Sequence, residues 1–231
     1  MTSVSENWQR LQARVAAAAE RAGRRPSDVT TIAVSKTFPA HAVQEAYEGG
    51  VRIFGENYVQ EALEKMAALP GDIHWHMIGH LQTNKAKQVA GRFALIHSVD
   101  SLHVAREIDK QAAKREIKQP ILVQVNIADE ETKSGFEPAA LLDAVGEIAQ
   151  LGSLGIRGLM TIGPLAGNPE DVRWVFAELR SLRDGARARF AQLELDELSM
   201  GMSGDFEVAI EEGATLIRVG RAIFGERPAK V

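Results

Sequence analysis

The chain has 231 residues, of which 45% are hydrophobic and 25% charged, with a formal net charge of −4 and no cysteine. These values are ordinary for a globular protein and argue against a nucleic-acid-binding surface, which normally carries a basic excess. The absence of cysteine excludes disulfides, thiolate catalysis and cysteine-ligated zinc, and it fits a reducing compartment.

The N-terminus lacks the basic and apolar regions of a signal peptide, and no apolar run is long enough to cross a bilayer. We therefore expect a cytoplasmic protein that does not enter membranes. The first predicted element is an amphipathic helix over residues 5–22, with Trp8, Leu11 and Val15 on one face and Gly23 as its stop signal. Because this helix precedes the first strand, we expect it to pack outside the main repeat.

From residue 30 onward, β-rich apolar segments alternate with helical segments. The predicted strands span residues 30–35, 51–54, 73–78, 94–99, 120–126, 156–160, 197–199 and 215–219. The predicted helices span residues 40–47, 58–68, 84–90, 102–115, 138–150, 169–190, 206–211 and 222–224. Eight strand-helix units predict a (β/α)8 TIM barrel, an α/β fold, as a single domain over residues 1–231. An open doubly wound sheet is the alternative, but the loop after its first strand is normally glycine-rich, and residues 35–39 contain no glycine.

In such a barrel, the carboxyl ends of the strands converge on the face that carries the chemistry. Polar residues and glycines follow most of the predicted strands here: Lys36, Glu56, Asn57, Gly79, His80, Asp100, Asn126, Thr161, Ser203, Gly204, Gly220 and Arg221. Lys36, at the end of the first strand, is either a solvated turn residue or an amine held at the barrel mouth to condense with a carbonyl.

The last two strand ends indicate a phosphate site. The dipeptides Ser203-Gly204 and Gly220-Arg221 each come just before a predicted helix, whose N-terminal amides attract anions. Taken singly, each of these residues is better explained by a tight turn or a helix cap than by a ligand. Taken together, at the two strands where barrels often bind phosphate, they favour a phosphate. A phosphate opposite a lysine on the first strand suggests pyridoxal phosphate, whose aldehyde condenses with a neutral amine.

Charged and histidine residues within the strands allow several interpretations. Arg218 lies two residues before Gly220 and shares its face, so a ligand and a buried carboxylate on a neighbouring strand are both candidate partners. His74 and His76 share one strand face, as in some metal sites, but no carboxylate completes the set and hydrogen bonding is favoured. The acidic residues 129–131 are interpreted as a solvated loop rather than a glycosidase-type pair.

Several stretches resemble the pyridoxal-phosphate homeostasis protein family. They are AVSKT at 33–37, FGENY at 54–58, HMIGHLQTNK at 76–85, LSMGMS at 198–203 and RVGRAIFG at 218–225, with Asn126 and residues 133–136. The resemblance runs from the first strand to the C-terminus. It implies a barrel related to the N-terminal domain of alanine racemase, with pyridoxal 5'-phosphate (PLP) as its cofactor.

The resemblance also implies a set of cofactor contacts. Lys36 would be the Schiff-base lysine, and Arg218 would approach the pyridine nitrogen. The phosphate would be held by Ser203, Gly204 and Gly220. Further contacts would come from Asn57, His80, Met200 and Arg221. Family members usually carry Ser or Thr where this chain has Arg221, so its contact would come from the backbone amide.

The expected function follows from Arg218 and from the length of the chain. A cation opposite the pyridine nitrogen keeps that nitrogen unprotonated and weakens the cofactor as an electron sink. Racemases of this fold use a second domain, for which a chain ending at Val231 leaves no room. We therefore expect a monomeric, non-enzymatic protein that buffers PLP or delivers it to PLP-dependent apoenzymes. The alternatives are a PLP-dependent racemase, which needs Tyr58 or His80 near the cofactor, and a cofactor-free aldolase that forms a Schiff base between Lys36 and a phosphosugar.

Overall fold

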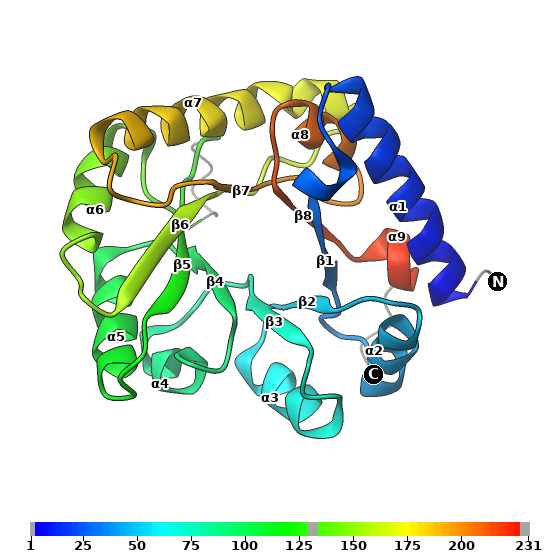
Figure 1. The fold of residues 1–231 in the computed structure, drawn as a ribbon, viewed down its shortest axis with the longest axis horizontal. Helices are drawn as coiled ribbons and strands as arrows, with labels where there is room; N and C mark the ends of the chain where they lie inside the picture. The colour runs from blue at the N-terminus through cyan, green and yellow to red at the C-terminus, as the bar shows by residue number, and fades with distance from the viewer. Residues whose placement is uncertain (1–2, 129–133, 227–231) are drawn as a thin grey trace.

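The computed structural model describes residues 3–128 and 134–226. Eight parallel strands pair in sequence order and β8 pairs with β1, so the sheet closes into a barrel with helices around it (Figure 1). The strands are β1 (Thr30–Val34), β2 (Ile53–Glu56), β3 (His74–Met77), β4 (Leu95–Val99), β5 (Gln119–Gln124), β6 (Leu154–Met160), β7 (Glu197–Ser199) and β8 (Leu216–Val219). This confirms the predicted (β/α)8 TIM barrel.

The helices follow the predicted alternation. They are α1 (Val4–Arg21), α2 (Ala40–Glu48), α3 (Val59–Ala68), α4 (Ala86–Val89), α5 (Leu102–Ala113), α6 (Leu141–Ile148), α7 (Arg173–Arg189), α8 (Phe206–Glu211) and α9 (Arg221–Phe224). Short 3-10 turns add η1 (Pro26–Asp28), η2 (Thr83–Lys85), η3 (Pro138–Ala140) and η4 (Pro169–Val172). No helix within the described ranges is both long and apolar enough to span a bilayer.

The additional N-terminal helix is present as α1 and packs against α2, α8 and α9 (Figure 1). Its N-cap Ser3 and Glu6 form a reciprocal capping box, which satisfies two backbone N–H groups at the start of the helix. Leu11 and Val15 are buried on its inner face, as the amphipathic pattern predicted. This helix therefore covers the outside of the barrel where the first and last strands meet.

Two kinds of boundary differ from the prediction. Strand β2 starts two residues later than expected and extends through Gly55 to Glu56, because buried partners satisfy the Glu56 carboxylate within the structure. Three predicted helices begin with 3-10 turns, and two of these turns start at Pro138 and Pro169, where proline suits the first helical position.

The barrel interior changes from apolar to polar along the strands. One apolar cluster is separate from the larger core between sheet and helices and consists of Ile32, Leu95, Leu122, Met160 and Leu216. Side chains alternate along a strand, so Arg218 points to the same side as Leu216, and His97 to the same side as Leu95. The interior thus carries polar groups just below the carboxyl ends of the strands.

Candidate functional site

A cavity of about 680 Å³ opens at the carboxyl ends of the strands. Seven of the nine predicted cofactor-contacting residues line it: Lys36, Asn57, Ser203, Gly204, Arg218, Gly220 and Arg221. Apolar side chains, including those of Val34, Ile78 and Ile162, also contribute to its wall. The seven predicted residues come from the first two and the last two strand-helix units, and the fold brings them together at one cavity.

A buried ionic cluster lies directly beside Lys36. Lys65 Nζ, on α3, lies 2.6 Å from Glu56 Oε1 and 2.7 Å from Glu61 Oε1, and it donates to the Ser35 carbonyl at 2.7 Å. Ser35 Oγ also donates to Glu56 Oε1, at 2.7 Å. Burial raises the pKa of the Glu56 carboxyl, while Lys65 opposes that shift. The cluster thus anchors the backbone immediately before Lys36.

The residue after Lys36 is held by the same cluster. The Thr37 N–H donates to Glu61 Oε1 at 2.6 Å. Thr37 has φ 69°, in the left-handed region that a β-branched residue rarely adopts. A contact on each side, one to Ser35 and one to Thr37, therefore fixes the strained turn that presents Lys36 to the cavity.

The loops after β7 and β8 pack closely against neighbouring elements because glycines occupy two positions. Gly201 has φ +90°, and a Cβ there would lie 2.6 Å from the Ala209 Cβ. A Cβ at Gly220 would lie 3.0 Å from the Val34 carbonyl oxygen of β1. In the β7 loop, Asp205 Oδ1 accepts from the Met202 N–H at 2.5 Å. Both loops line the cavity, the first through residues 202–205 and the second through Gly220 and Arg221.

Arg218 is held by neutral acceptors. Its Nη1 donates to Ser199 Oγ at 2.5 Å and its Nη2 to the Thr161 carbonyl at 2.8 Å. Within the described residues, no carboxylate of a neighbouring strand is therefore hydrogen-bonded to Arg218. Burial lowers the pKa of the guanidinium to about 10, and the charge of Asp205 opposes this shift. The group remains a cation at neutral pH.

Sequence reasoning missed the residues behind Arg218. Ser199 Oγ lies 2.8 Å from His97 Nδ1, and His97 Nε2 lies 3.0 Å from His76 Nδ1. The expectation that His76 makes a core hydrogen bond is thereby confirmed, whereas His74 is exposed at the start of β3. A histidine and two serines in the apolar β4 and β7 segments were the available signal, but local spacing does not reveal which of them meet across the barrel.

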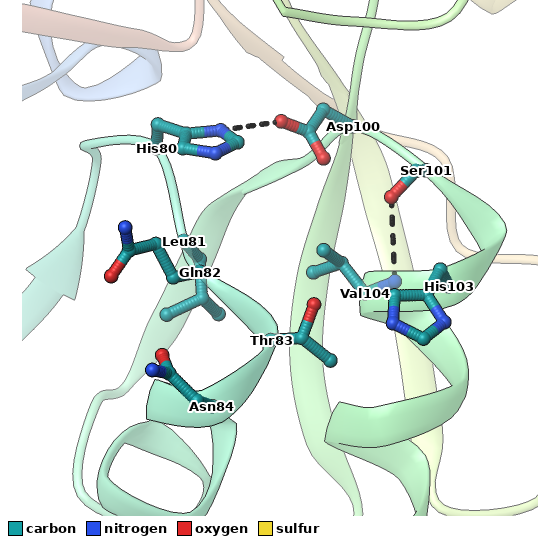
Figure 2. Close-up of a pocket in the computed structure, with 9 residues that line it drawn as sticks. All are labelled: His80, Leu81, Gln82, Thr83, Asn84, Asp100, Ser101, His103 and Val104. Carbon is teal, nitrogen blue, oxygen red and sulfur yellow. Dashed lines mark hydrogen bonds and ion pairs between the residues drawn. The ribbon is translucent and has the colours of Figure 1, made fainter.

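Two predicted contacts lie away from the cavity lining. Met200 is fully buried in the core. His80 lines a separate groove of about 500 Å³, where its Nδ1 lies 2.8 Å from Asp100 Oδ2 and its side chain is 59% exposed (Figure 2). In the same groove Ser101 caps α5 by accepting from the Val104 N–H at 3.3 Å.

Other residues named from the sequence line neither the cavity nor the groove, or lie outside the described residues. Tyr58 is 55% exposed and is not part of the cavity lining. The Asn126 N–H donates to the Phe136 carbonyl at 3.0 Å. The acidic residues 129–131 and Lys133 lie outside the described residues.

Comparison with known proteins gives one family. Residues 7–228 match the alanine racemase N-terminal domain. The pyridoxal phosphate homeostasis protein of Aquifex aeolicus is 47% identical over 223 residues, covering 96% of this chain and 97% of that protein. PipY of Synechococcus elongatus PCC7942 without PLP has a TM-score of 0.87 at 40% identity, covering 96% of this chain and 100% of its own. The PipY structure with PLP bound has a TM-score of 0.84 at the same identity and coverage. This chain belongs to the pyridoxal phosphate homeostasis protein family.

Proposed function

We propose that this chain binds PLP in the 680 Å³ cavity as a Schiff base on Lys36 and buffers it or delivers it to PLP-dependent apoenzymes. The observation that carries the proposal is the convergence of Lys36, Arg218 and two glycine-containing loops on one cavity. The PLP-bound structure of PipY, a relative of 40% identity, supports the same ligand. The cytoplasmic location and the monomeric state expected from the sequence belong to this proposal.

The residues present fit such a group. Asn57 Oδ1 is buried and has no hydrogen-bond partner within the described residues, so it offers a polar contact to a ligand in the cavity. The apolar wall suits an aromatic ring, and loop amides together with Arg221 suit a phosphate. Glycine at 220 lets the loop after β8 lie close against β1, since a Cβ there would be 3.0 Å from the Val34 carbonyl oxygen. When bound, PLP supplies an aldehyde that condenses with an amine.

The roles of the protein groups favour holding the cofactor over catalysis. Arg218 presents a positive charge, which keeps an adjacent pyridine nitrogen unprotonated and so limits the ring as an electron sink. Racemisation needs a second acid/base group, and the candidates from the sequence were Tyr58 and His80. Neither of these side chains is part of the cavity lining in the described structure. This supports a carrier rather than a racemase.

The test is an absorption spectrum of the purified protein before and after PLP addition, followed by borohydride reduction and peptide mapping. We expect a yellow protein whose reduced pyridoxyl group maps to Lys36. The Lys36→Ala variant should lose the label, and Lys87→Ala, which removes an exposed lysine, should keep it. A protein that stays colourless with added PLP would overturn the proposal and favour the aldolase. Turnover of L-alanine would overturn the carrier role.

A further inference from the structure

A chain of hydrogen-bonded side chains crosses the barrel interior from Arg218 to His76. It passes through Ser199 on β7 and His97 on β4, strands that are not neighbours in the sheet, so the contact between them spans the lumen. All four residues are buried, with exposed fractions between 0% and 7%. Each polar group in the chain must therefore be satisfied by its neighbours.

The donor–acceptor direction of this chain is set by Arg218. A guanidinium only donates, so Ser199 Oγ accepts from it and keeps its single hydroxyl proton for another partner. An unprotonated Nδ1 on His97, 2.8 Å away, accepts a hydrogen bond from this hydroxyl. His97 then carries its proton on Nε2 and donates it to His76 Nδ1 at 3.0 Å. The opposite direction would leave the buried Ser199 hydroxyl proton without this acceptor.

The charge state of the two histidines agrees with this direction. Burial lowers the pKa of His76 to about 4, and the nearby His74 adds to the effect. Burial lowers the pKa of His97 well below its usual range, with further contributions from His76 and Arg218. Both imidazoles are therefore neutral at pH 7, and each carries one N–H. Asp205, whose charge acts on Arg218, completes the set of charged groups around the chain, and among the described residues its carboxylate accepts from the Met202 N–H rather than from either ring.

The geometry points to Ser199 and His97 as positioning residues for Arg218, with His76 and His97 both fixed as the Nε2–H tautomer. The hydroxyl of Ser199 and the carbonyl of Thr161 orient the guanidinium without neutralising it, because neither acceptor is charged. The guanidinium, which lines the cavity, is thus held in one orientation by two neutral acceptors. The effect on the cofactor rests on the proposed function, whereas the tautomers do not.

The first experiment needs neither cofactor nor variant. Long-range ¹H–¹⁵N correlation spectra of the histidine-labelled protein at pH 7.5 identify which ring nitrogens carry a proton. We expect His76 and His97 to be neutral with bare Nδ1 and protonated Nε2, and their signals to stay unchanged between pH 6 and pH 8. The ring signals of the exposed His74, at the start of the same strand as His76, serve as an internal reference for the assignment. An Nδ1–H tautomer or an imidazolium at His97 would overturn the inferred direction.

The second experiment compares three serine variants. Ser199→Ala removes both the acceptor of Arg218 and the donor to His97, Ser199→Thr keeps the hydroxyl, and Ser98→Ala removes another buried serine hydroxyl, which donates to the Gly79 carbonyl. We expect Ser199→Ala to weaken PLP binding about tenfold, the lower range for losing a hydrogen bond to a charged group, and to shift the visible band of the bound cofactor. Ser199→Thr restores the wild-type band, and Ser98→Ala leaves it in place.

The outcomes of these experiments separate the two proposals. An unchanged band and affinity in Ser199→Ala, with the His97 tautomer also unchanged, refutes the positioning role. An equal band shift in Ser98→Ala refutes it too, because a general loss of packing then explains the result. A wild-type protein that binds no PLP refutes the proposed function alone, since the tautomers are measured without the cofactor.

Discussion

Replacing Lys65 by methionine removes the cation that lies between Glu56 and Glu61 beside Lys36. Lys65 is 4% exposed and Glu56 is 0% exposed, so water cannot compensate the carboxylate that remains. Breaking a buried ion pair from one side costs about 3–5 kcal/mol. The Glu61 side chain is 25% exposed, and methionine retains most of the buried aliphatic volume of lysine. We therefore expect a loss of unfolding free energy at the lower end of this range, about 3 kcal/mol. For a protein of this size that corresponds to a decrease in Tm of roughly 6–12 °C.

The loss of stability in Lys65→Met depends on pH, and the pKa of Glu56 sets the direction. Burial already raises the pKa of Glu56 above its ordinary value, and removing Lys65 removes the charge that opposes this shift. A carboxyl whose pKa is raised by folding binds a proton more readily in the folded state, so stability falls as pH rises through the folded pKa. The destabilisation of Lys65→Met should therefore be larger at pH 8 than at pH 5.

Urea unfolding followed by circular dichroism at both pH values measures the effect. Lys87→Met, which changes an exposed lysine, is the matched control and should stay within about 0.5 kcal/mol of wild type. Adding Glu56→Gln to Lys65→Met removes the unpaired charge and should recover at least about 1.5 kcal/mol of unfolding free energy. The reasoning is refuted if Lys65→Met costs less than about 1 kcal/mol at pH 8, or if the double variant shows no recovery.

Three further substitutions test the site. Gly201→Ala places a Cβ 2.6 Å from the Ala209 Cβ at φ +90°, so thermal unfolding should show a loss of about 3 kcal/mol, and a loss below 1 kcal/mol contradicts the packing argument. His80→Ala should leave the PLP affinity within about twofold of the wild-type value in a fluorescence titration, because His80 lines a separate groove. A tenfold loss of affinity would instead indicate that His80 contacts the cofactor. Arg221→Ser should keep the affinity within about threefold if the backbone amide makes the phosphate contact, whereas a larger loss that depends on salt would indicate the side chain.

The sequence predicted the barrel because each strand-helix unit carries its own periodicity and stop signals. Seven of the nine cofactor contacts expected from the sequence line the cavity, since the topology of a barrel brings strand ends such as Lys36 and Gly220 to one face whatever their separation along the chain. Contacts across the lumen were beyond this reasoning. His97 meets Ser199 only because β4 and β7 face each other inside the closed barrel, and no local pattern encodes that register.

Glu56 shows a second limit of sequence reasoning. The predicted strand ended at Phe54, and Glu56 was placed among the polar residues that follow the strands. In the structure the strand continues through Glu56, whose carboxylate accepts from Lys65 on the following helix and from Ser35, the residue just after β1. Strand length here depends on a tertiary ion pair, which propensity does not report.

The candidate site lies at the seam where the first and last strands close the barrel. In the β1–β8 register, Ile32 pairs with Arg218 and Ala33 with Val219. The rings of Phe38 and Phe224 stack across the same seam, with their centroids 5.0 Å apart. Helix α1 supports this junction from outside, where the Asn7 side chain donates to the Ile223 carbonyl at 2.9 Å. Lys36 and the loop after β8 thus line the same cavity only when β1 has paired with β8. A ligand that bridges them binds the closed barrel and not its opened forms, so its binding free energy adds to the stability of the seam.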